Sequence, residues 1–341
     1  MARSTVYNDI VTDELYEKVN QDNKDLLDEF IEYLESTGKS ELTIIGYTSD
    51  IKIYYIWNLE NNKDKVFTDI TKRDVMKYQN WLINTLKLSS SRVRRLRAAL
   101  SSMSNFIENV LDDEFPKFKN IINKIPAPMN QPVREKTVFE DEDLDELLKI
   151  LTEKELYQEA CALSLAMESG ARKAELTRFK VEYFKPENIV HGSLYRTPEK
   201  IQTKGRGGGK MLHKYVLANN FQPYLDRWLR QREELKIDNE YLFVTKSNGE
   251  WIQAKTSTFD SWAERFNQFI EKHFYWHSNR HYFTTSLSKA NIPAEVIKQI
   301  IGWENVSMVS IYNDTGIDDE LGKYFGEDGI KQVEQKSLSD L

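Results

Sequence analysis

The chain has 341 residues, which at roughly 150 residues per domain favours two domains. Hydrophobic residues make up 40% and aromatic residues 12% of the chain, which excludes wholesale disorder. The single cysteine, Cys161, excludes a disulfide framework and a zinc site built on cysteines. No apolar run reaches the ~18 residues of a membrane helix, and the N-terminus lacks a signal-peptide core. We therefore expect a cytoplasmic protein with no membrane partner.

The formal net charge is −7, which by itself argues against a polyanionic partner such as DNA. The charge is unevenly distributed. Residues 314–341 hold eight acidic residues and three lysines, a net of −5, so that residues 1–313 carry only −2. The acidity belongs to the terminal segment, and the whole-chain sum does not exclude DNA.

The first third of the chain is expected to be helical. Residues 1–22 are polar and are expected to form a flexible N-terminal arm. Apolar residues at three- and four-residue steps predict four helices, over 24–34, 40–55, 71–86 and 89–110. These helices define a small helical domain over residues 23–125. Three prolines follow within seven residues and predict a linker over 126–136: Pro126, Pro128 and Pro132.

A second domain is expected over residues 137–341. Its first helix opens on four acidic residues, 140–143, which suit the positive end of a helix dipole. Residues 194–217 have the pattern of two strands around a glycine-rich turn at 205–209. Helices are expected again over 221–235 and from residue 256 onward. The fold class is therefore mainly α with a small β-sheet, in two domains.

A basic strip lies within the last predicted helix of the first domain. Residues 86–97 include five basic residues and no acidic residue. The three serines of this strip can cap a helix and donate hydrogen bonds to phosphate. A solvated helix face is the alternative interpretation. The candidate DNA-binding residues are Lys87, Ser89, Ser90, Ser91, Arg92, Arg94, Arg95 and Arg97.

Four short clusters in the second domain carry candidate chemistry. Two are pairs spaced i, i+3, which share a helix face; one is a lysine beside the glycine turn; one is a Gly-Trp step followed nine residues later by a tyrosine. Singly, each has an ordinary structural interpretation, such as a surface ion pair or a core aromatic. The residues are Arg172 with Glu175, Lys204, His277 with Arg280, and Trp303 with Tyr312.

Together and in this order, the clusters resemble the tyrosine recombinase family of phage integrases. That family has an arginine in a Gly-x-Arg-x-x-Glu-Leu context, a lysine on a β-turn, His-x-x-Arg, and a nucleophilic tyrosine nine residues after a Gly-His or Gly-Trp step. The flanking segments 281–285 and 300–303 also resemble the family. The resemblance spans both domains. It implies a helical SAM-like core-binding domain followed by a catalytic domain, which together clamp duplex DNA.

The resemblance implies cleavage of a DNA phosphodiester by tyrosine, giving a 3′-phosphotyrosine, without ATP or any other cofactor. Arg172 and Arg280 would bind the phosphate oxygens, since guanidinium groups donate paired hydrogen bonds and keep their proton. Tyr312 would be the nucleophile, and His277 would bind phosphate or take the tyrosine proton. Trp303 would add one N–H donor. Glu175 would orient its neighbours, and Lys204 would protonate the leaving oxygen.

Two features depart from the common family pattern. Trp303 stands where most members have histidine, although some simple recombinases also have tryptophan there. The turn is unusually rich in glycine, and three further lysines lie near it: Lys200, Lys210 and Lys214. We favour Lys204 as the general acid because it directly precedes the turn.

The resemblance also implies partners. We expect a homotetramer on duplex DNA with inverted-repeat sites, working through a Holliday junction as part of a mobile genetic element, in the bacterial nucleoid or a phage-infected cell. Residues 314–341 are expected to dock on a neighbouring protomer, through an amphipathic helix over 318–333. Alternatives with related chemistry are a telomere resolvase and a type IB topoisomerase. A non-catalytic DNA-binding protein on the same fold is the rival from another class.

Metal and nucleotide sites are the remaining alternatives. His273, His277 and His281 repeat at four-residue steps, a spacing that could hold zinc, but the glutamate of a His-Glu-x-x-His motif is missing. The glycine turn matches neither a P-loop nor Gly-x-Gly-x-x-Gly. No metal site is therefore expected.

Overall fold

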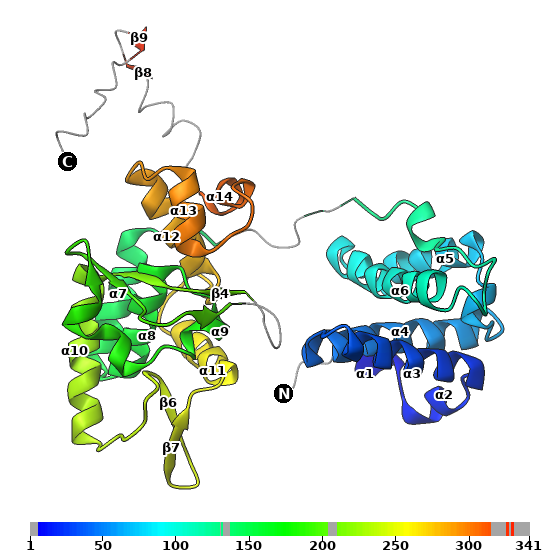
Figure 1. Cartoon of the computed structure of the whole chain (residues 1–341), viewed down its shortest axis with the longest axis horizontal. Helices are drawn as coiled ribbons and strands as arrows, with labels where there is room; N and C mark the ends of the chain where they lie inside the picture. The colour runs from blue at the N-terminus through cyan, green and yellow to red at the C-terminus, as the bar shows by residue number, and fades with distance from the viewer. Residues whose placement is uncertain are drawn as a thin grey trace. The chain divides into compact units, whose positions relative to one another are not determined.

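The computed structural model describes residues 6–129, 131, 137–203, 210–314, 325–326 and 329–330. Contacts within the chain define two units, which divide near residue 135 (Figure 1). The predicted fold class, mainly α with small sheets in two parts, is confirmed. Within the described ranges, no helix combines the length and the apolar character that crossing a bilayer requires.

The first unit is built entirely from helices. The longest are α3, α4 and α6. The helices, in chain order, are α1 (Val6–Ile10), α2 (Asp13–Glu17), α3 (Gln21–Ser36), α4 (Glu41–Asn61), η1 (Phe67–Asp69), α5 (Lys72–Asn80), η2 (Trp81–Thr85), α6 (Ser90–Val110) and η3 (Ile122–Lys124). The core between them is rich in aromatic residues, among which Tyr54 meets both Phe67 and Tyr78 edge to face. The four helices expected from apolar spacing are all present.

Side-chain caps set where these helices begin. Ser40 accepts a hydrogen bond from the backbone N–H of Thr43 at the start of α4, and Ser89 does the same for Arg92 at the start of α6. Thr71 and Asp74 form a reciprocal capping box at α5. Such caps satisfy backbone donors that have no partner inside the helix.

The expectation of a flexible arm over residues 1–22 is wrong for residues 6–22. Both α1 and α2 pack against α4, and α3 begins at Gln21. Val6, Ile10 and Leu15 are partly buried against the core of this unit. The apolar residues are too few to show a helical period in the sequence, but their burial joins this segment to the domain.

The second unit surrounds one buried helix, α8. Its elements, in chain order, are α7 (Asp141–Glu153), α8 (Tyr157–Ser169), α9 (Lys173–Leu176), η4 (Val181–Phe184), η5 (Pro186–Asn188), β1 (Ile189–Val190), β2 (Leu194–Arg196), β3 (Ile201–Gln202), β4 (Met211–Leu212), β5 (Tyr215–Leu217), α10 (Ala218–Glu234), β6 (Val244–Ser247), β7 (Glu250–Gln253), α11 (Thr256–Phe266), α12 (Ser278–Lys289), α13 (Ala294–Ile301) and α14 (Ser307–Tyr312). All of α8 from Glu159 onward is buried, and α7, α10 and α12 pack against it.

The strands are short and antiparallel. β2 lies between β1 and β5, with Tyr195 opposite Val216, while β3 pairs with β4 and β6 with β7. The two strands predicted over 194–217 are present as two antiparallel pairs, β2 with β5 and β3 with β4. Residues 204–209, where the turn is predicted, lie outside the described residues.

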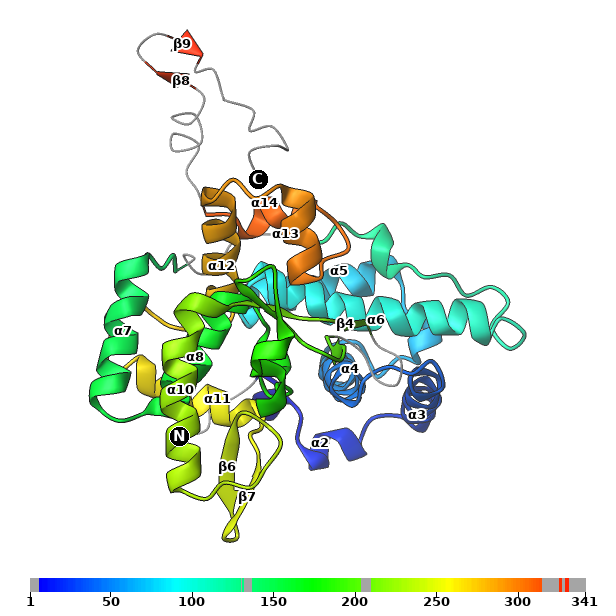
Figure 2. The same cartoon turned by 60° about the vertical axis from the view of Figure 1, so that its left-hand side comes forward.

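The last three helices form a separate small cluster. Figures 1 and 2 show α12, α13 and α14 grouped at one end of the second unit and the β6–β7 hairpin at the opposite end. Phe283, Ile301 and Val309 are buried between these three helices. This packing fixes the ends of α12, α13 and α14 close together.

The helix predicted over residues 318–333 is contradicted at the four residues of that span that the structure describes. They form two short antiparallel strands, β8 (Phe325–Gly326) and β9 (Gly329–Ile330). Two of the four are glycine, and each glycine lowers the stability of a helix by about 1 kcal/mol relative to alanine. The other residues of 315–341 lie outside the described part of the chain.

Arg97 does not belong to the surface of the basic strip. Its side chain is 5% exposed and points into the first unit. Nη1 donates to Gln79 Oε1 at 2.6 Å, and Nη2 donates to the carbonyl oxygens of Ile122 and Ile125 at 2.7 and 2.5 Å. The guanidinium fastens the segment after α6 to the helices, so Arg97 is corrected from a DNA-binding to a structural residue.

Replacing Arg97 by methionine should destabilise the first unit by about 2–4 kcal/mol, because it removes three hydrogen bonds of a buried guanidinium and leaves the half-buried carbonyl of Ile125 without this donor. Equilibrium urea unfolding followed by tryptophan fluorescence measures the loss. The matched control is Arg94→Met, since Arg94 is exposed and donates only to the carbonyl of Pro128 among described residues. It should change stability by less than about 0.5 kcal/mol. Equal losses for both variants would contradict this assignment.

Candidate active site

Six of the seven predicted catalytic residues lie in described segments, at the ends of four helices. They stand at the beginnings of α9 and α12, after α13, and at the end of α14: Arg172, Glu175, His277, Arg280, Trp303 and Tyr312. Because α12 packs against α8, α13 and α14, these ends meet. The fold therefore brings together groups that the sequence separates by up to 140 residues.

Two glycines in left-handed backbone end the helices that precede the site. Gly170 ends α8 at φ +56°, and Gly302 ends α13 at φ +85°. A Cβ at Gly170 would lie 2.6 Å from the Phe283 ring, and one at Gly302 would overlap the side chain of Leu212. Glycine is thus required at both turns, which direct Arg172 and Trp303 into the site.

Arg172 is held by Glu175. Its Nη1 donates to Glu175 Oε1 at 2.8 Å, and its backbone N–H donates to Oε2 at 3.0 Å. Glu175 is fully buried, and Oε2 also lies 3.0 Å from Lys214 Nζ. Burial alone raises the pKa of Glu175, but Lys214, the Arg172 N–H and the two arginine charges bring it below the ordinary value. The carboxylate is ionised and fixes one edge of the Arg172 guanidinium.

Arg280 is fully buried beneath the site. Nη1 donates to the carbonyl of Gly170 at 2.9 Å, and Nη2 to that of Ile301 at 3.4 Å. Burial and the charge of Arg172 lower the pKa of Arg280 to about 10, so it stays protonated at neutral pH. Its Nε has no acceptor among the described residues and is available to an anion.

Trp303 packs against both Arg280 and Tyr312. Its ring lies 4.9 Å from the Arg280 guanidinium carbon and 4.8 Å from the Tyr312 ring. The side chain is buried, and its Nε1 likewise finds no acceptor in the described part of the chain. A buried N–H donor without a partner costs free energy, so it points to a ligand that accepts the bond.

Tyr312 lies directly against a histidine. Its Oη is 2.7 Å from His277 Nε2, and its ring stacks on that of His281 with centroids 4.4 Å apart. Burial, followed by the charges of Arg280 and Arg172, lowers the pKa of His277 below 6.5. The imidazole is therefore neutral at neutral pH and able to accept the phenol proton. A tyrosine with a base at hydrogen-bond distance has the geometry of an activated nucleophile.

Taken together, these groups suit one kind of chemistry. Arg280 and Trp303 pack on the ring of Tyr312, whose hydroxyl contacts a neutral histidine. Arg172 is close enough to lower the pKa of that histidine. Unused donors on Arg280 and Trp303 fit an oxyanion that gains charge during attack by the phenol. The site can therefore carry out nucleophilic attack on a phosphoryl group.

The lysines differ in where the structure places them. Lys204 lies outside the described residues. Lys210 Nζ donates to the carbonyl of Gly302 at 3.1 Å, beside Trp303, whereas Lys214 is buried against Glu175. In the sequence, Lys214 is only one of several lysines near the predicted turn. Lys214 lies two residues before Val216 and so shares its face of an extended segment, but this spacing alone does not distinguish a buried ion pair from an exposed charge.

Most of the basic strip lies at the start of α6. Lys87, Arg94 and Arg95 are exposed, and Ser89 caps the helix. A carboxylate that the sequence analysis missed organises the strip: buried Asp50 of α4 binds Arg92 Nη1 at 2.7 Å and Arg95 Nε at 3.2 Å. Asp50 orients the two guanidinium groups and also cancels one of the strip's charges.

The three histidines do not form a metal centre. Within the described ranges, no group of three or more His, Cys, Asp or Glu side chains is arranged to hold a metal ion. His277 and His281 instead flank the ring of Tyr312.

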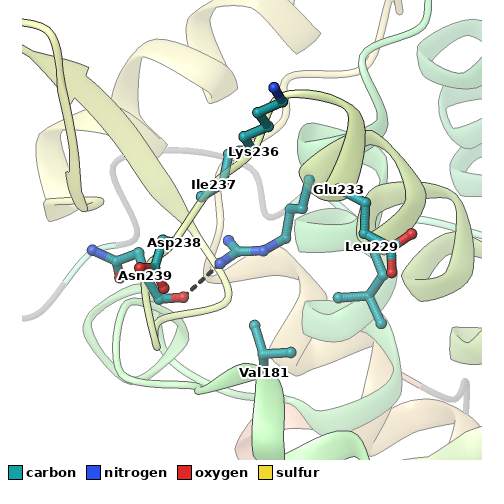
Figure 3. A pocket seen from close by; sticks show the side chains of 8 residues that line it. Val181, Leu229, Glu233, Lys236, Ile237, Asp238 and Asn239 are labelled. Carbon is teal, nitrogen blue, oxygen red and sulfur yellow. Dashed lines mark hydrogen bonds between the residues drawn. The ribbon is translucent and has the colours of Figure 1, made fainter.

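A hollow outside the candidate active site lies at the C-terminal end of α10 (Figure 3). It measures about 520 Å³, and its wall includes Arg232, whose Nη2 donates to the carbonyl of Asn239 at 2.6 Å. The guanidinium also binds the carbonyls of Tyr241 and Leu242, which occupies its donors. None of the residues that meet around Tyr312 lines this hollow, so it is not the candidate active site.

Comparison with known proteins defines the class. The model described as "Phage integrase family" matches residues 137–316, and "Phage integrase, N-terminal SAM-like domain" matches residues 26–117. The SPbeta prophage-derived recombinase-like protein YomM of Bacillus subtilis is 32% identical over 75% of this chain and 74% of its own. Tyrosine recombinase XerA of Pyrococcus horikoshii is 26% identical, covering 85% and 89%. The chain belongs to the phage integrase family and is a tyrosine recombinase.

Solved structures agree in fold. The Tn1549 transposon integrase in complex with transposon right end DNA gives a TM-score of 0.64 at 15% identity, covering 87% of this chain and 98% of that one. A lambda integrase dimer bound to a core site gives 0.61 at 18% identity, covering 97% and 86%. At these identities the similarity establishes the shared fold.

Proposed function

We propose that this recombinase breaks and rejoins duplex DNA at specific sites through a covalent bond between Tyr312 and the 3′ phosphate. The observation that carries the proposal is the 2.7 Å contact between Tyr312 Oη and His277 Nε2, beside the unused donors of Arg280 and Trp303. The DNA-bound state of the Tn1549 and lambda integrase structures supports duplex DNA as the substrate.

The proposed reaction exchanges one phosphate ester for another. Tyr312 Oη forms a bond to phosphorus while its proton passes to His277, and the bond from phosphorus to the 5′ oxygen breaks. The 5′ oxygen leaves as a hydroxyl after taking a proton. A 5′-hydroxyl from the partner strand then attacks the phosphotyrosine and releases Tyr312. Because the bonds exchanged are of the same kind, neither ATP nor another cofactor is needed.

The cations stabilise the charge that develops on the phosphate. Arg172 presents the guanidinium edge that Glu175 leaves open, and Arg280 and Trp303 donate from Nε and Nε1. Such pre-oriented donors are worth about 3–4 kcal/mol each in the transition state. Lys204 supplies the proton to the 5′ oxygen, since a lysine ammonium on the turn predicted from the sequence can follow the leaving group. Lys210, anchored at Gly302, is the alternative donor.

Both units bind the duplex in this proposal. The strip of the first unit contacts phosphates or a groove through Lys87, Arg94 and Arg95, with Arg92 behind them and Ser89, Ser90 and Ser91 at the helix start. Four protomers on two sites with inverted repeats would exchange strands through a Holliday junction. We propose that residues 314–341 dock on a neighbouring protomer, and that the protein acts in the cytoplasm, where such DNA lies.

Replacing Tyr312 by phenylalanine tests the reaction. On a nicked suicide substrate, wild-type protein should become covalently attached to DNA, whereas Tyr312→Phe should bind the same DNA with unchanged affinity and form no adduct. Denaturing gel electrophoresis detects the adduct, and gel shift measures binding. Tyr275→Phe is the matched control, because Tyr275 is a half-buried tyrosine near the site whose hydroxyl has no role in the proposal. An adduct with Tyr312→Phe would overturn the proposal.

The rate of cleavage should depend on the neutral form of His277. Its pKa is lowered from 6.5, so the imidazole is neutral above that lowered value and loses its ability to accept a proton as the pH falls through it. Single-turnover cleavage should be level near neutral pH and decline in acid. His277→Gln should slow cleavage by about 10²–10⁴ and abolish the acid decline. A decline of the same shape in His277→Gln would assign it to another group.

Ending the chain after Asp314 tests the role proposed for the terminal segment. Binding to a single site should be unchanged, because the strip and the site residues remain. Pairing of two sites, measured by native gel or light scattering, should weaken. Full recombination by the shortened chain would rule out docking.

A further inference from the structure

A fully buried lysine adjoins the site and has no part in the reaction proposed above. Lys214 stands between β4 and β5, and its side chain is 0% exposed. Its backbone N–H donates to Thr197 Oγ1 at 2.9 Å, and its carbonyl accepts from the Thr197 N–H at 3.0 Å. Thr197 is itself buried, so the end of the sheet fixes the position of Lys214. A buried lysine is rare unless it is paired.

The partner of Lys214 is the carboxylate that holds Arg172. Nζ lies 3.0 Å from Glu175 Oε2, and no second acceptor is found for it in the described parts of the chain. The other oxygen of Glu175 accepts from Arg172 Nη1 at 2.8 Å. Glu175 therefore connects a cation inside the protein to a cation that faces the substrate.

The charges around Glu175 determine whether it keeps its own charge. The groups that face it are Lys214 from the sheet, Arg280 from α12 and Arg172 from α9. Burial opposes ionisation, and Lys214 is the strongest of the contributions that lower the pKa of Glu175. The pKa of Lys214 is itself lowered by burial, while Glu175 acts to raise it. Without Lys214, the buried carboxyl group would lose its main counter-charge.

We infer that Lys214 is a positioning residue for the strand cleavage proposed above: its charge keeps Glu175 ionised, and ionised Glu175 orients Arg172 toward the phosphate. This inference rests on the proposed function. Lys214 is not assigned as the proton donor to DNA, because its ammonium group is committed to the buried ion pair with Glu175.

The test compares Lys214→Met with wild type in two measurements. The first is the ratio of their single-turnover cleavage rates between pH 5.5 and 9. Buried Glu175 should take up a proton in Lys214→Met, so the ratio should fall toward acid pH, by on the order of a hundredfold for a misplaced guanidinium, and recover toward alkaline pH. Lys214→Arg keeps the charge, and its ratio should not vary with pH.

The second measurement does not depend on activity. In protein labelled with ¹³C at glutamate carboxyl groups, the Glu175 signal, assigned through Glu175→Gln, should titrate in Lys214→Met within this pH range and remain ionised in wild type. Lys180→Met is the matched control. Lys180 also pairs with glutamates, Glu199 and Glu240, but away from the site, so both the ratio and the Glu175 signal should match wild type.

Several outcomes would overturn the inference. Glu175 could remain ionised in Lys214→Met, or it could titrate while the rate ratio stays constant with pH. If Lys214→Met does not fold, Lys214→Gln replaces it, and failure of both to fold would make Lys214 a structural residue only. If wild type forms no adduct with DNA although Glu175 titrates as expected in Lys214→Met, the proposed function has failed and the positioning role fails with it, while the ion pair itself is confirmed.

Discussion

A single buried carboxylate, Glu175, allows three positive charges to share one site. Like charges about 4 Å apart repel by about 4 kcal/mol at an effective dielectric constant of about 20. Arg172 and Lys214 both contact Glu175, and Arg280 lies close enough to influence it. The three cations and one anion leave a net charge of +2 on these four residues. A phosphodiester brings one negative charge, and a phosphoryl centre under attack by a phenolate brings about two.

The donors that carry this charge are held in fixed positions. Arg280 is fixed by carbonyl groups at the ends of α8 and α13, and both ends are set by glycines in left-handed backbone. Trp303 and Tyr312 pack on its guanidinium. Water would have to reorient around a developing charge, whereas these dipoles are already in place. The small cluster of α12, α13 and α14 thus has a purpose beyond burying apolar surface.

The sequence was informative where local geometry decides the outcome. The i, i+3 spacing places Arg172 near Glu175 and His277 near Arg280, so each pair could be predicted to act together, although Arg172 and Glu175 meet through a capping box at the start of α9 and not on a shared helix face. Apolar spacing and capping serines predicted the long helices. The direction of Arg97, the burial of Lys214 and the role of Asp50 could not be predicted, because each depends on a partner more than fifteen residues away along the chain. Residues 6–22 were misjudged because a few apolar side chains show no period, although α4 buries them.

The hydrogen bonds that hold Tyr312 to α12 decide which protomer supplies the nucleophile for each DNA strand in the proposed reaction. The Asp314 N–H donates to Thr285 Oγ1, and Thr285 Oγ1 donates to the carbonyl of Tyr312, so the chain on either side of the nucleophile is tied to α12 of the same polypeptide. Its hydroxyl meets the histidine of its own chain. On the proposed function, each protomer therefore cuts in cis the strand that it holds. An inactive subunit in a mixed assembly would silence one strand and could not be rescued by its neighbour.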